Sequence, residues 1–389
     1  MFDILGFKVG LYINKVTKSI PSDMYSFSIS DNIYSAFPTV KITFADISGL
    51  YLELNNFNQG VPLNIKYGIL AGFNMLDADF RTSCRDTVSP AVNSSGLNGT
   101  LEVHGIHDSF FSNRNAPNIA LKEITVSSAV RKLFPYELKL FVETTKGNIE
   151  SYAIDDPYQF TRDILLPQAS NGKVRPFCFF RNLANELCFE SINKLEEAIP
   201  SEILLFAGDV SINPVNMMTS FLPFNEGLEK TLINFHAEGK ILKNDFSFSK
   251  ITKNIATDAK CKIPVMGNTK IHHSPYFHRQ FNPKVDYEQL NTAFLSDSMR
   301  SGFFVDKAMG MLPFHPNLVA GKTVQIIASL VDGDNKFELS ETFSGKWLIE
   351  QSTHIWDGSA KKGQTQLILC RSSMMPKFTS KLMTDSFKG

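Results

Sequence analysis

The feature that most constrains the fold of this chain is a similarity between its first third and its end. One alternating apolar run ends at His107, and a comparable run ends at His354. A polar loop and a second apolar run follow each of them, and with the two histidines aligned, Leu121 falls on Ile368 without a gap. Alternation that is rich in β-branched residues is typical of strands. We therefore expect two related β-modules within one polypeptide.

Length and composition indicate a globular protein of several domains. A chain of 389 residues is too long for one compact core, and its 43% hydrophobic content is ordinary for globular proteins. Lys plus Arg and Asp plus Glu number 39 each, without a dense basic stripe, which argues against a nucleic-acid-binding protein. A net charge of zero also gives little long-range repulsion, which suits a subunit that associates.

The cysteines and the N-terminus indicate a reducing compartment. Five cysteines are scattered without the Cys-x-x-Cys spacing of a zinc site, so reduced core thiols are favoured. The first residues lack the features of a signal peptide. No apolar run approaches the roughly 18–20 residues that span a bilayer. We expect the chain to be made and to fold in a cytoplasm.

The pattern divides the chain into four segments, and the predicted fold class is α+β, mainly β. Residues 1–122 alternate as strands and predict a first antiparallel β-barrel domain, with a long polar loop at 81–98. Residues 123–205 predict a smaller α/β insert domain. Residues 206–371 predict a second β-barrel domain with an irregular or helical insertion near 251–301, and residues 372–389 form a C-terminal tail.

Three local patterns define the α/β insert. Apolar residues recur at helical spacing from Thr125 until Pro135 ends them. Asp156 followed by Pro157 is typical of an N-cap with proline at the first helical position. The runs 176–181 and 187–191 predict a hairpin.

Two alternations elsewhere carry specific expectations. Tyr25, Phe27 and Ile29 alternate with polar residues, which predicts that these three side chains are buried. In the insertion of the second barrel, residues 262–283 are expected to be irregular, and a helix is expected from Asp286 to Gly302.

Motifs that carry chemistry are weak in this chain. Gly321-Lys322-Thr323 ends like a phosphate-binding loop, but Pro316 stands where that loop needs its first glycine, and a strand follows where a helix is required. Asp155-Asp156 is explained as a helix start and Glu196-Glu197 as a solvated face. No nucleophile motif is present. We expect no catalytic or cofactor-binding residues, and we expect that the protein is not an enzyme.

The histidines do not form a predicted metal site. His104 and His107 lie three apart on a strand, so they point to opposite faces. His272, His273 and His278 have no Cys or acidic residue at ligand spacing, and solvent-exposed or interface histidines are the favoured interpretation.

The C-terminal tail is the one candidate interface in the sequence. Its apolar residues, which suit an irregular groove, either dock into a partner or fold back on their own barrel, and both alternatives stay open. They are Met374, Met375, Phe378, Leu382, Met383 and Phe387.

The closing β-module resembles a known family. Residues 345–354, a polar loop, and a strand that ends in Leu369-Cys370-Arg371 resemble the final hairpin of tailed-bacteriophage baseplate hub proteins. Those hubs typically have Val-x-His where this chain has Ser-Thr-His354. The total length, the all-β start and the aromatic strand at 176–181 are also similar to that family.

The resemblance implies a structural role in a virion. Hubs of this family carry two tube-like β-barrels, and three chains form a ring of six similar units that joins a six-fold tail tube to a three-fold central spike. The implied partners are two further copies of the chain, the tail tube protein and the central spike protein, with the tape measure protein as an additional candidate. DNA would pass through the lumen without specific binding.

Two alternative functions remain at this stage. One is a distal tail or tube-initiating ring protein that is six-fold by itself and has a single barrel. The other is a carbohydrate-binding or carbohydrate-degrading tail protein, which would need an aromatic-lined cleft with paired carboxylates.

Overall fold

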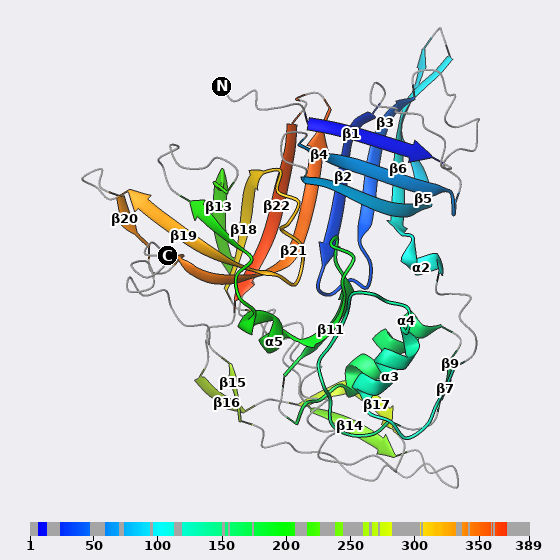
Figure 1. Cartoon of the computed structure of the whole chain (residues 1–389), viewed down its shortest axis with the longest axis vertical. Coiled ribbons are helices and arrows are strands. Elements are labelled where there is room, and N and C mark those ends of the chain that lie inside the picture. Colours follow the sequence, from blue (N-terminus) through cyan, green and yellow to red (C-terminus); the bar gives the residue numbers. More distant parts are fainter. Residues whose placement is uncertain are drawn as a thin grey trace.

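The computed structural model (Figure 1) describes most of the predicted β and α/β segments. The described residues are 7–13, 24–46, 59–69, 74–93, 96–112, 119–149, 152–154, 156–172, 175–206, 216–225, 238–243, 260–263, 267–270, 273–281, 304, 306–331, 337–340, 343–358, 360 and 362–371. The predicted helix at 286–302 and the C-terminal tail lie outside them.

Six strands form the first part of the main sheet, and all their pairings with one another are antiparallel. They are β1 (Phe7–Ile13), β2 (Met24–Asn32), β3 (Thr39–Asp46), β4 (Pro62–Ile69), β5 (Asn74–Asn93) and β6 (Gly96–His107). Their order in the sheet is β1-β4-β5-β6-β3-β2. The strand-rich start is confirmed.

The expected polar loop at 81–98 is wrong. Most of this segment belongs to β5 and β6, which pair from Phe80↔His107 to Asn93↔Gly96. Two register shifts, between Thr82 and Cys84 and between Thr87 and Ser89, interrupt the ladder. Such bulges break the strict alternation of a strand, which is why the pattern was not recognisable as one.

Seven further strands come from residues 202–371, and the first of them, β12, lies almost wholly in the predicted insert rather than in the second predicted barrel. They are β12 (Glu202–Phe206), β13 (Ser220–Asn225), β18 (Asp306–Pro313), β19 (Thr323–Val331), β20 (Phe337–Leu339), β21 (Gly345–Asp357) and β22 (Lys362–Arg371). The path β21-β22-β18-β13 is antiparallel, and β19 pairs with β12, β20 and β21.

The two strand groups are joined into one sheet (Figure 1). Strand β2 pairs with β3 on one side and with β21 on the other, so both of its hydrogen-bonding edges are used. We expected two separate barrels, whereas the described strands form one thirteen-stranded sheet: ten strands follow an open path, and β19, with β12 and β20, branches from β21. The division of the chain into domains at residues 122 and 205 stays a prediction.

The similarity between the two apolar repeats does not correspond to equivalent pairings. Ile368 lies in β22 and faces Gln351 of β21. Leu121 lies in β7 (Ile119–Leu121), which pairs with β9 (Tyr152–Ile154) and not with β6. The two halves instead each place an antiparallel hairpin at the junction: β2–β3 and β21–β22 meet edge to edge. The first continues outward through β6, β5, β4 and β1, and the second through β18 and β13.

The helices of the insert begin where the sequence predicts. After the short α2 (Ser109–Ser112), α3 (Val126–Leu133) is capped by Thr125, whose side chain accepts from the amide of Ser128. The carboxylate of Asp156 accepts from the amide of Gln159 and caps α4 (Pro157–Phe160). Helix α4 continues as a π-helical turn, η2 (Thr161–Leu165), and a 3₁₀ turn, η3 (Leu166–Gln168).

The predicted hairpin of the insert is confirmed. Strands β10 (Phe177–Arg181) and β11 (Leu187–Ser191) are antiparallel, and β8 (Leu140–Val142) joins β11 in a parallel pairing. Helix α5 (Ile192–Glu197) follows at once, capped by Ser191. Figure 1 shows α3, α4, β11 and α5 on one side of the main sheet. Glu196, expected on a solvated face, is buried.

The stretch expected to be irregular contains strands. These are β15 (Lys260–Ile263), β16 (Gly267–Lys270) and β17 (His273–Phe281), together with β14 (Glu238–Lys243) upstream of it. Strands β15 and β16 form an antiparallel pair, and β14 pairs with β17 in parallel. The prediction for 262–283 is therefore wrong over these ranges.

The core crosses the boundaries between the predicted domains. One cluster combines Phe27, Ile42 and Tyr67 of the first strands with Trp356 of β21 and with Phe314. A second cluster fills the insert, and a third lies among β13, β18, β19, β21 and β22. No helix in the described part of the chain is long and apolar enough to cross a membrane.

Candidate functional site

The candidate site is the junction of β2 and β21, which we call the seam. Residues Ser26–Asn32 of β2 face residues Gln351–Asp357 of β21 in register, from Ser26↔Asp357 to Asn32↔Gln351. More than 300 residues of chain separate the paired strands. This pairing is the backbone connection between the strands of the first part of the chain and those of the last part, so it fixes how the two strand groups lie relative to each other.

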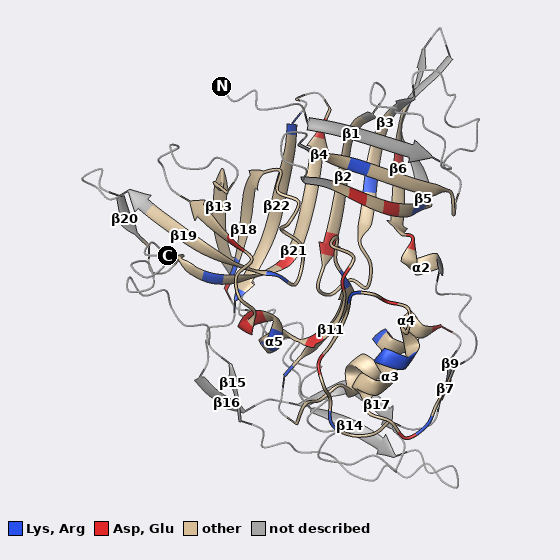
Figure 2. Ribbon diagram, in the orientation of Figure 1, with Lys and Arg blue, Asp and Glu red and all other residues tan. Residues whose placement is uncertain are grey.

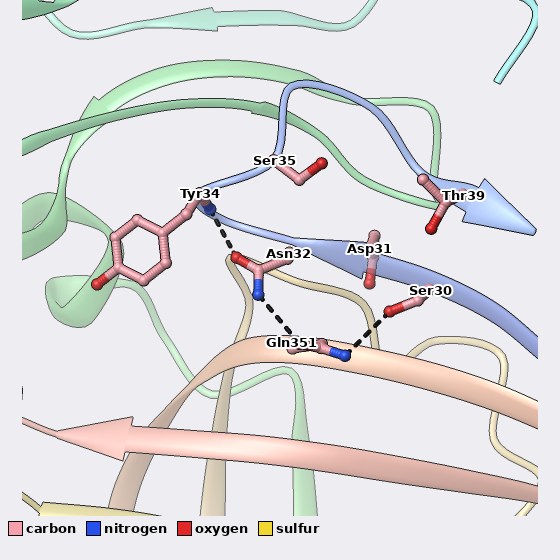
Figure 3. A pocket seen from close by; sticks show the side chains of 7 residues that line it. All are labelled: Ser30, Asp31, Asn32, Tyr34, Ser35, Thr39 and Gln351. Carbon is pink, nitrogen blue, oxygen red and sulfur yellow. Dashed lines mark hydrogen bonds between the residues drawn. The ribbon is translucent and has the colours of Figure 1, made fainter. Parts of the chain in front are cut away.

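Amide and hydroxyl side chains tie the strands together on the wet face of the seam (Figure 3). Asn32 donates to the amide oxygen of Gln351 at 3.1 Å. The nitrogen of Gln351 lies 3.2 Å from both Ser30 Oγ and Thr353 Oγ1, and these two hydroxyls are 3.0 Å apart. The side chain of Asn32 also accepts from the backbone amide of Tyr34 at 2.7 Å.

A polar pocket of about 380 Å³ opens on this face. It is lined by Ser30, Asp31, Asn32, Tyr34, Ser35, Thr39 and Gln351. Asp31 is its one carboxylate and Tyr34 its one aromatic ring. The paired carboxylates that glycosidase chemistry requires are therefore not present in this pocket.

Unlike the polar side chains on the wet face of the seam, the side chain of Asp31 points into the protein interior. Its side chain is 1% exposed. The carboxylate accepts the amide N–H of Leu183 at 2.7 Å and that of Ala320 at 3.2 Å. Leu183 lies in the β10–β11 turn of the insert, and Ala320 precedes β19. One carboxylate thus connects the seam to two other parts of the fold.

Burial changes the protonation of Asp31. Removal from water raises the pKa of this carboxyl to about 7, while the N–H groups of Leu183 and Ala320 act in the opposite direction. The desolvation cost exceeds the stabilisation by the N–H dipoles. Asp31 therefore titrates near neutral pH.

Asp31 was not among the residues singled out from the sequence, although a signal was present. Phe27, Ile29 and Ile33 face the core, and the period of two places Asp31 on the same face. An acid at a core position of a strand is uncommon enough to mark a special site. In contrast, Tyr25 was expected to be buried but is 54% exposed, because the pairing of β2 with β3 shifts register between Met24 and Ser26.

His354, which anchors the family resemblance, is a core residue. Its ring is fully buried, and Nδ1 lies 2.9 Å from Thr365 Oγ1 on β22. Burial lowers the pKa of His354 to about 3, and the neighbouring His315 acts in the same direction. The imidazole is therefore neutral at physiological pH, and it stabilises the core next to the seam.

Aromatic rings fill the space behind the seam. Phe27 of β2 stacks on Trp356 of β21, with ring centroids 5.8 Å apart, and meets Tyr67 edge-on at 5.1 Å. Phe314 contacts both Tyr67 and His354 at centroid distances of 5.2 and 5.3 Å. These contacts come from both halves of the chain, so side-chain packing reinforces the backbone pairing.

A buried ion pair lies where β21 passes from one partner strand to the other. Lys307 Nζ is 3.0 Å from Glu350 Oε2, and both residues are buried. The ladder between β21 and β22 shifts register between Ile349 and Gln351, which leaves Glu350 at a bulge. The bulge separates the part of β21 that pairs with β19 from the part that pairs with β2.

The phosphate-loop-like sequence has a structural role. Gly321 has φ of +83°, and Lys322 forms an ion pair of 2.7 Å with Glu186 in the β10–β11 turn. The following strand, β19, begins at Thr323, as expected. Gly321 and Lys322 also line a second pocket, of about 330 Å³, between the insert and this loop.

The structure does not bring the other histidines together as ligands. His104 Nε2 contacts Glu102 at 2.7 Å, whereas His107 Nδ1 contacts the hydroxyl of Ser109 at 2.8 Å. His273 and His278 lie in β17, and His272 is outside the described residues. Within the described ranges, no three His, Cys, Asp or Glu side chains are grouped as metal ligands.

The tail residues proposed as an interface are not placed by the structure. Met374, Met375, Phe378, Leu382, Met383 and Phe387 all lie outside the described residues, so their role stays a prediction. The described site thus connects two groups of strands, through strand pairing, uncharged polar contacts and one buried carboxylate.

Comparison with known proteins reveals a similarity of fold to solved structures. The sequence matches no known family and no curated protein. The structure is similar to the 43 kDa tail protein of prophage MuSo2 from Shewanella oneidensis, with a TM-score of 0.56 and 11% identity over 95% of this chain and 100% of that one. It is also similar to a tail protein from Neisseria meningitidis, with a TM-score of 0.53 and 11% identity over 95% and 98% of the two chains.

These matches extend over nearly the whole length of both proteins. The chain therefore has the fold of phage tail proteins, and the resemblance noted in the sequence is confirmed at the level of fold.

Proposed function

We propose that this chain is a baseplate (tail) hub protein of a tailed bacteriophage. In this proposal three copies form a ring with six similar β-units, and the ring joins the six-fold tail tube to the three-fold central spike. The protein would act by its shape within the virion, without catalysis, in the path through which the genome is ejected.

The observation that carries the proposal is the combination of fold and seam. A prophage tail protein and a tail protein from Neisseria meningitidis share the fold over 95% of the chain. Within the chain, the seam makes two hairpin systems continuous. A three-fold assembly that must match a six-fold one needs two comparable units per subunit, held in a fixed relation. The seam supplies such a fixed relation.

The charge distribution supports a channel role. Residues 308–313, 351–356 and 363–370 contain no charged side chain, and Figure 2 shows these parts of β18, β21 and β22 in tan. The positions on these segments that are not buried include Thr353, Gln364 and Gln366, together with Met309, Met311, Ile355 and Ile368. DNA binds proteins mainly through Lys and Arg contacts to phosphate. An uncharged face would let DNA pass without specific binding, and we place it toward the lumen.

The composition of the seam also supports a role without catalysis. Its polar side chains bond to one another, and Asp31 is engaged by two backbone amides. The tail tube and central spike proteins are the proposed partners, and the tape measure protein is a third candidate.

The copy number of the chain in purified particles tests this proposal. Quantitative mass spectrometry with isotope-labelled peptides would count this chain against the spike protein. The hub proposal predicts three copies per particle and a one-to-one ratio to the spike chain. Six copies would contradict it and favour a tube-initiating ring, and absence of the chain from the tail would rule out both.

A further inference from the structure

The buried carboxylate of Asp31 joins three parts of the fold. It belongs to β2 of the seam and accepts from Leu183 in the β10–β11 turn and from Ala320 in the segment 314–322. Backbone contacts accompany it, because the amide of Arg181 donates to Ala36 O at 3.1 Å and that of Gly321 to Ile349 O at 2.9 Å. The insert and the segment 314–322 are thus held on the seam around one acid.

The charged groups near Asp31 form ion pairs with residues other than Asp31. On the insert, Arg181 pairs with Glu137, and Glu186 pairs with Lys322 of the segment 314–322. On β21, Glu350 pairs with Lys307.

The remaining titratable groups are shifted toward their neutral forms. Burial raises the pKa of Tyr67 on β4, with a further contribution from Asp31, and burial lowers the pKa of both His354 and His315. In the described part of the chain, only N–H dipoles therefore balance a negative charge on Asp31.

A polar pocket lies next to this residue. Asp31 lines the 380 Å³ polar pocket on the wet face of the seam, together with Ser30, Asn32 and Thr39. A small opening of the junction would bring the carboxylate into contact with that pocket, where water would solvate its charge.

We propose that Asp31 is a pH-responsive joint: in its protonated form it keeps the β10–β11 turn and the segment 314–322 closed on the seam, and its deprotonation favours opening of this junction into the adjoining pocket. The inference concerns this chain alone and does not depend on the proposed role as a tail hub.

The direction of the effect follows from proton linkage. In the closed junction, burial raises the pKa of Asp31 to about 7, whereas a carboxyl exposed to water titrates near 4. The closed form therefore binds the proton more tightly than the open form. As the pH rises between these two values, the opening equilibrium constant increases by about tenfold per pH unit, and above about pH 7.5 it is constant.

Hydrogen exchange at two backbone amides tests the proposal on the full chain. The amides of Leu183 and Ala320 report opening directly, because each donates to Asp31. After correction for intrinsic exchange rates, their protection factors should fall by about tenfold per pH unit between pH 5 and 6.5. The amide of Ala129 in α3, bonded to Thr125 O, should show no such change.

A neutral variant and a matched surface variant complete the test. Asp31→Asn should make protection at Leu183 and Ala320 independent of pH. Asp77→Asn, which changes an exposed acid on β5 that pairs with Lys66, should leave the wild-type profile unchanged. If Asp31→Asn fails to fold, the wild-type profile decides. A flat wild-type profile at the two amides, or an equal change at all amides including Ala129, would overturn the proposal.

Discussion

Gly321 packs directly against the ring of Phe180, so that a Cβ atom on Gly321 would lie 2.8 Å from Cε2 of that ring. The glycine also has φ of +83°, which is unfavourable for other residues. Gly321→Ala should therefore lower the free energy of unfolding by about 3 kcal/mol, as the sum of steric overlap and backbone strain. Urea unfolding followed by fluorescence measures this change.

Gly60 provides the matched control for this substitution. It has φ of +84°, but among the described residues, apart from its two chain neighbours, no atom lies within 4 Å of the position of its Cβ. Gly60→Ala should cost only the backbone strain, about 1 kcal/mol. Equal losses in the two variants would show that contact with Phe180 does not matter.

The ion pair of Lys307 and Glu350 should be strongly coupled. Because both residues are buried, Lys307→Met leaves an uncompensated carboxylate and should destabilise the protein by about 3–5 kcal/mol. The double variant Lys307→Met with Glu350→Gln should recover a large part of this loss. A double-mutant cycle measured by chemical denaturation gives the coupling energy. Strict additivity of the two single losses would contradict the coupling.

Asp31 and His354 should give opposite dependences of stability on pH. Because the pKa of His354 is lowered to about 3, the unfolded chain takes up a proton that the folded chain does not, so stability is lost as the pH falls below about 6.5. Because the pKa of Asp31 is raised to about 7, its contribution is full at acidic pH and is lost as the pH rises from about 4 to 7.

Single variants separate the two contributions. Between pH 4.5 and 6, Asp31→Asn should make the free energy of unfolding rise more steeply with pH, and His354→Asn should make it fall, each by about 1 kcal/mol per pH unit relative to wild type. Urea titrations at several pH values measure these slopes. Changes with the opposite sign would contradict the burial of the corresponding group.

Thiol labelling tests the burial of the cysteines. Cys84 is exposed, whereas Cys178, Cys188 and Cys370 are buried, and burial raises the pKa of Cys188 and Cys370 thiols. Iodoacetamide should label Cys84 in the native protein and reach the other three only after denaturation. Mass spectrometry of tryptic peptides locates the label, and rapid native modification of Cys188 would contradict the packing of β11.

Local signals predicted the insert well. The helix after Thr125 was recognisable from its apolar periodicity, and the start at Asp156 from its capping pattern, because both signals depend on a few neighbouring residues. The hairpin at 176–191 was recognisable because two aromatic runs flank a polar turn. In each case, the information that determines the element lies within a short stretch of sequence.

Long-range pairing was not predictable in the same way. The seam joins Ser26–Asn32 to residues beyond 350, and no local pattern specifies which strand is the neighbour. The similarity of the His107 and His354 segments suggested a repeat, but alternating apolar runs are similar in most strands, and Leu121 pairs elsewhere. The polar segment of β5 was missed because cross-strand pairing, interrupted by bulges, overrides its weak strand propensity.

The role of Asp31 was predictable only in part. Its position on the core face of β2 follows from the alternation, but its partners Leu183 and Ala320 come from distant segments. The sequence could therefore indicate that Asp31 is a buried acid, but it could not predict which segments contact it.

The most direct test of the proposed hub is a cryo-EM reconstruction of the tail end without imposed symmetry. It should show three copies of this chain in a closed ring, with the strand groups on either side of the β2·β21 seam in six similar positions beneath the tube. A ring of six copies, or three copies in which these strand groups occupy dissimilar positions, would contradict the proposal.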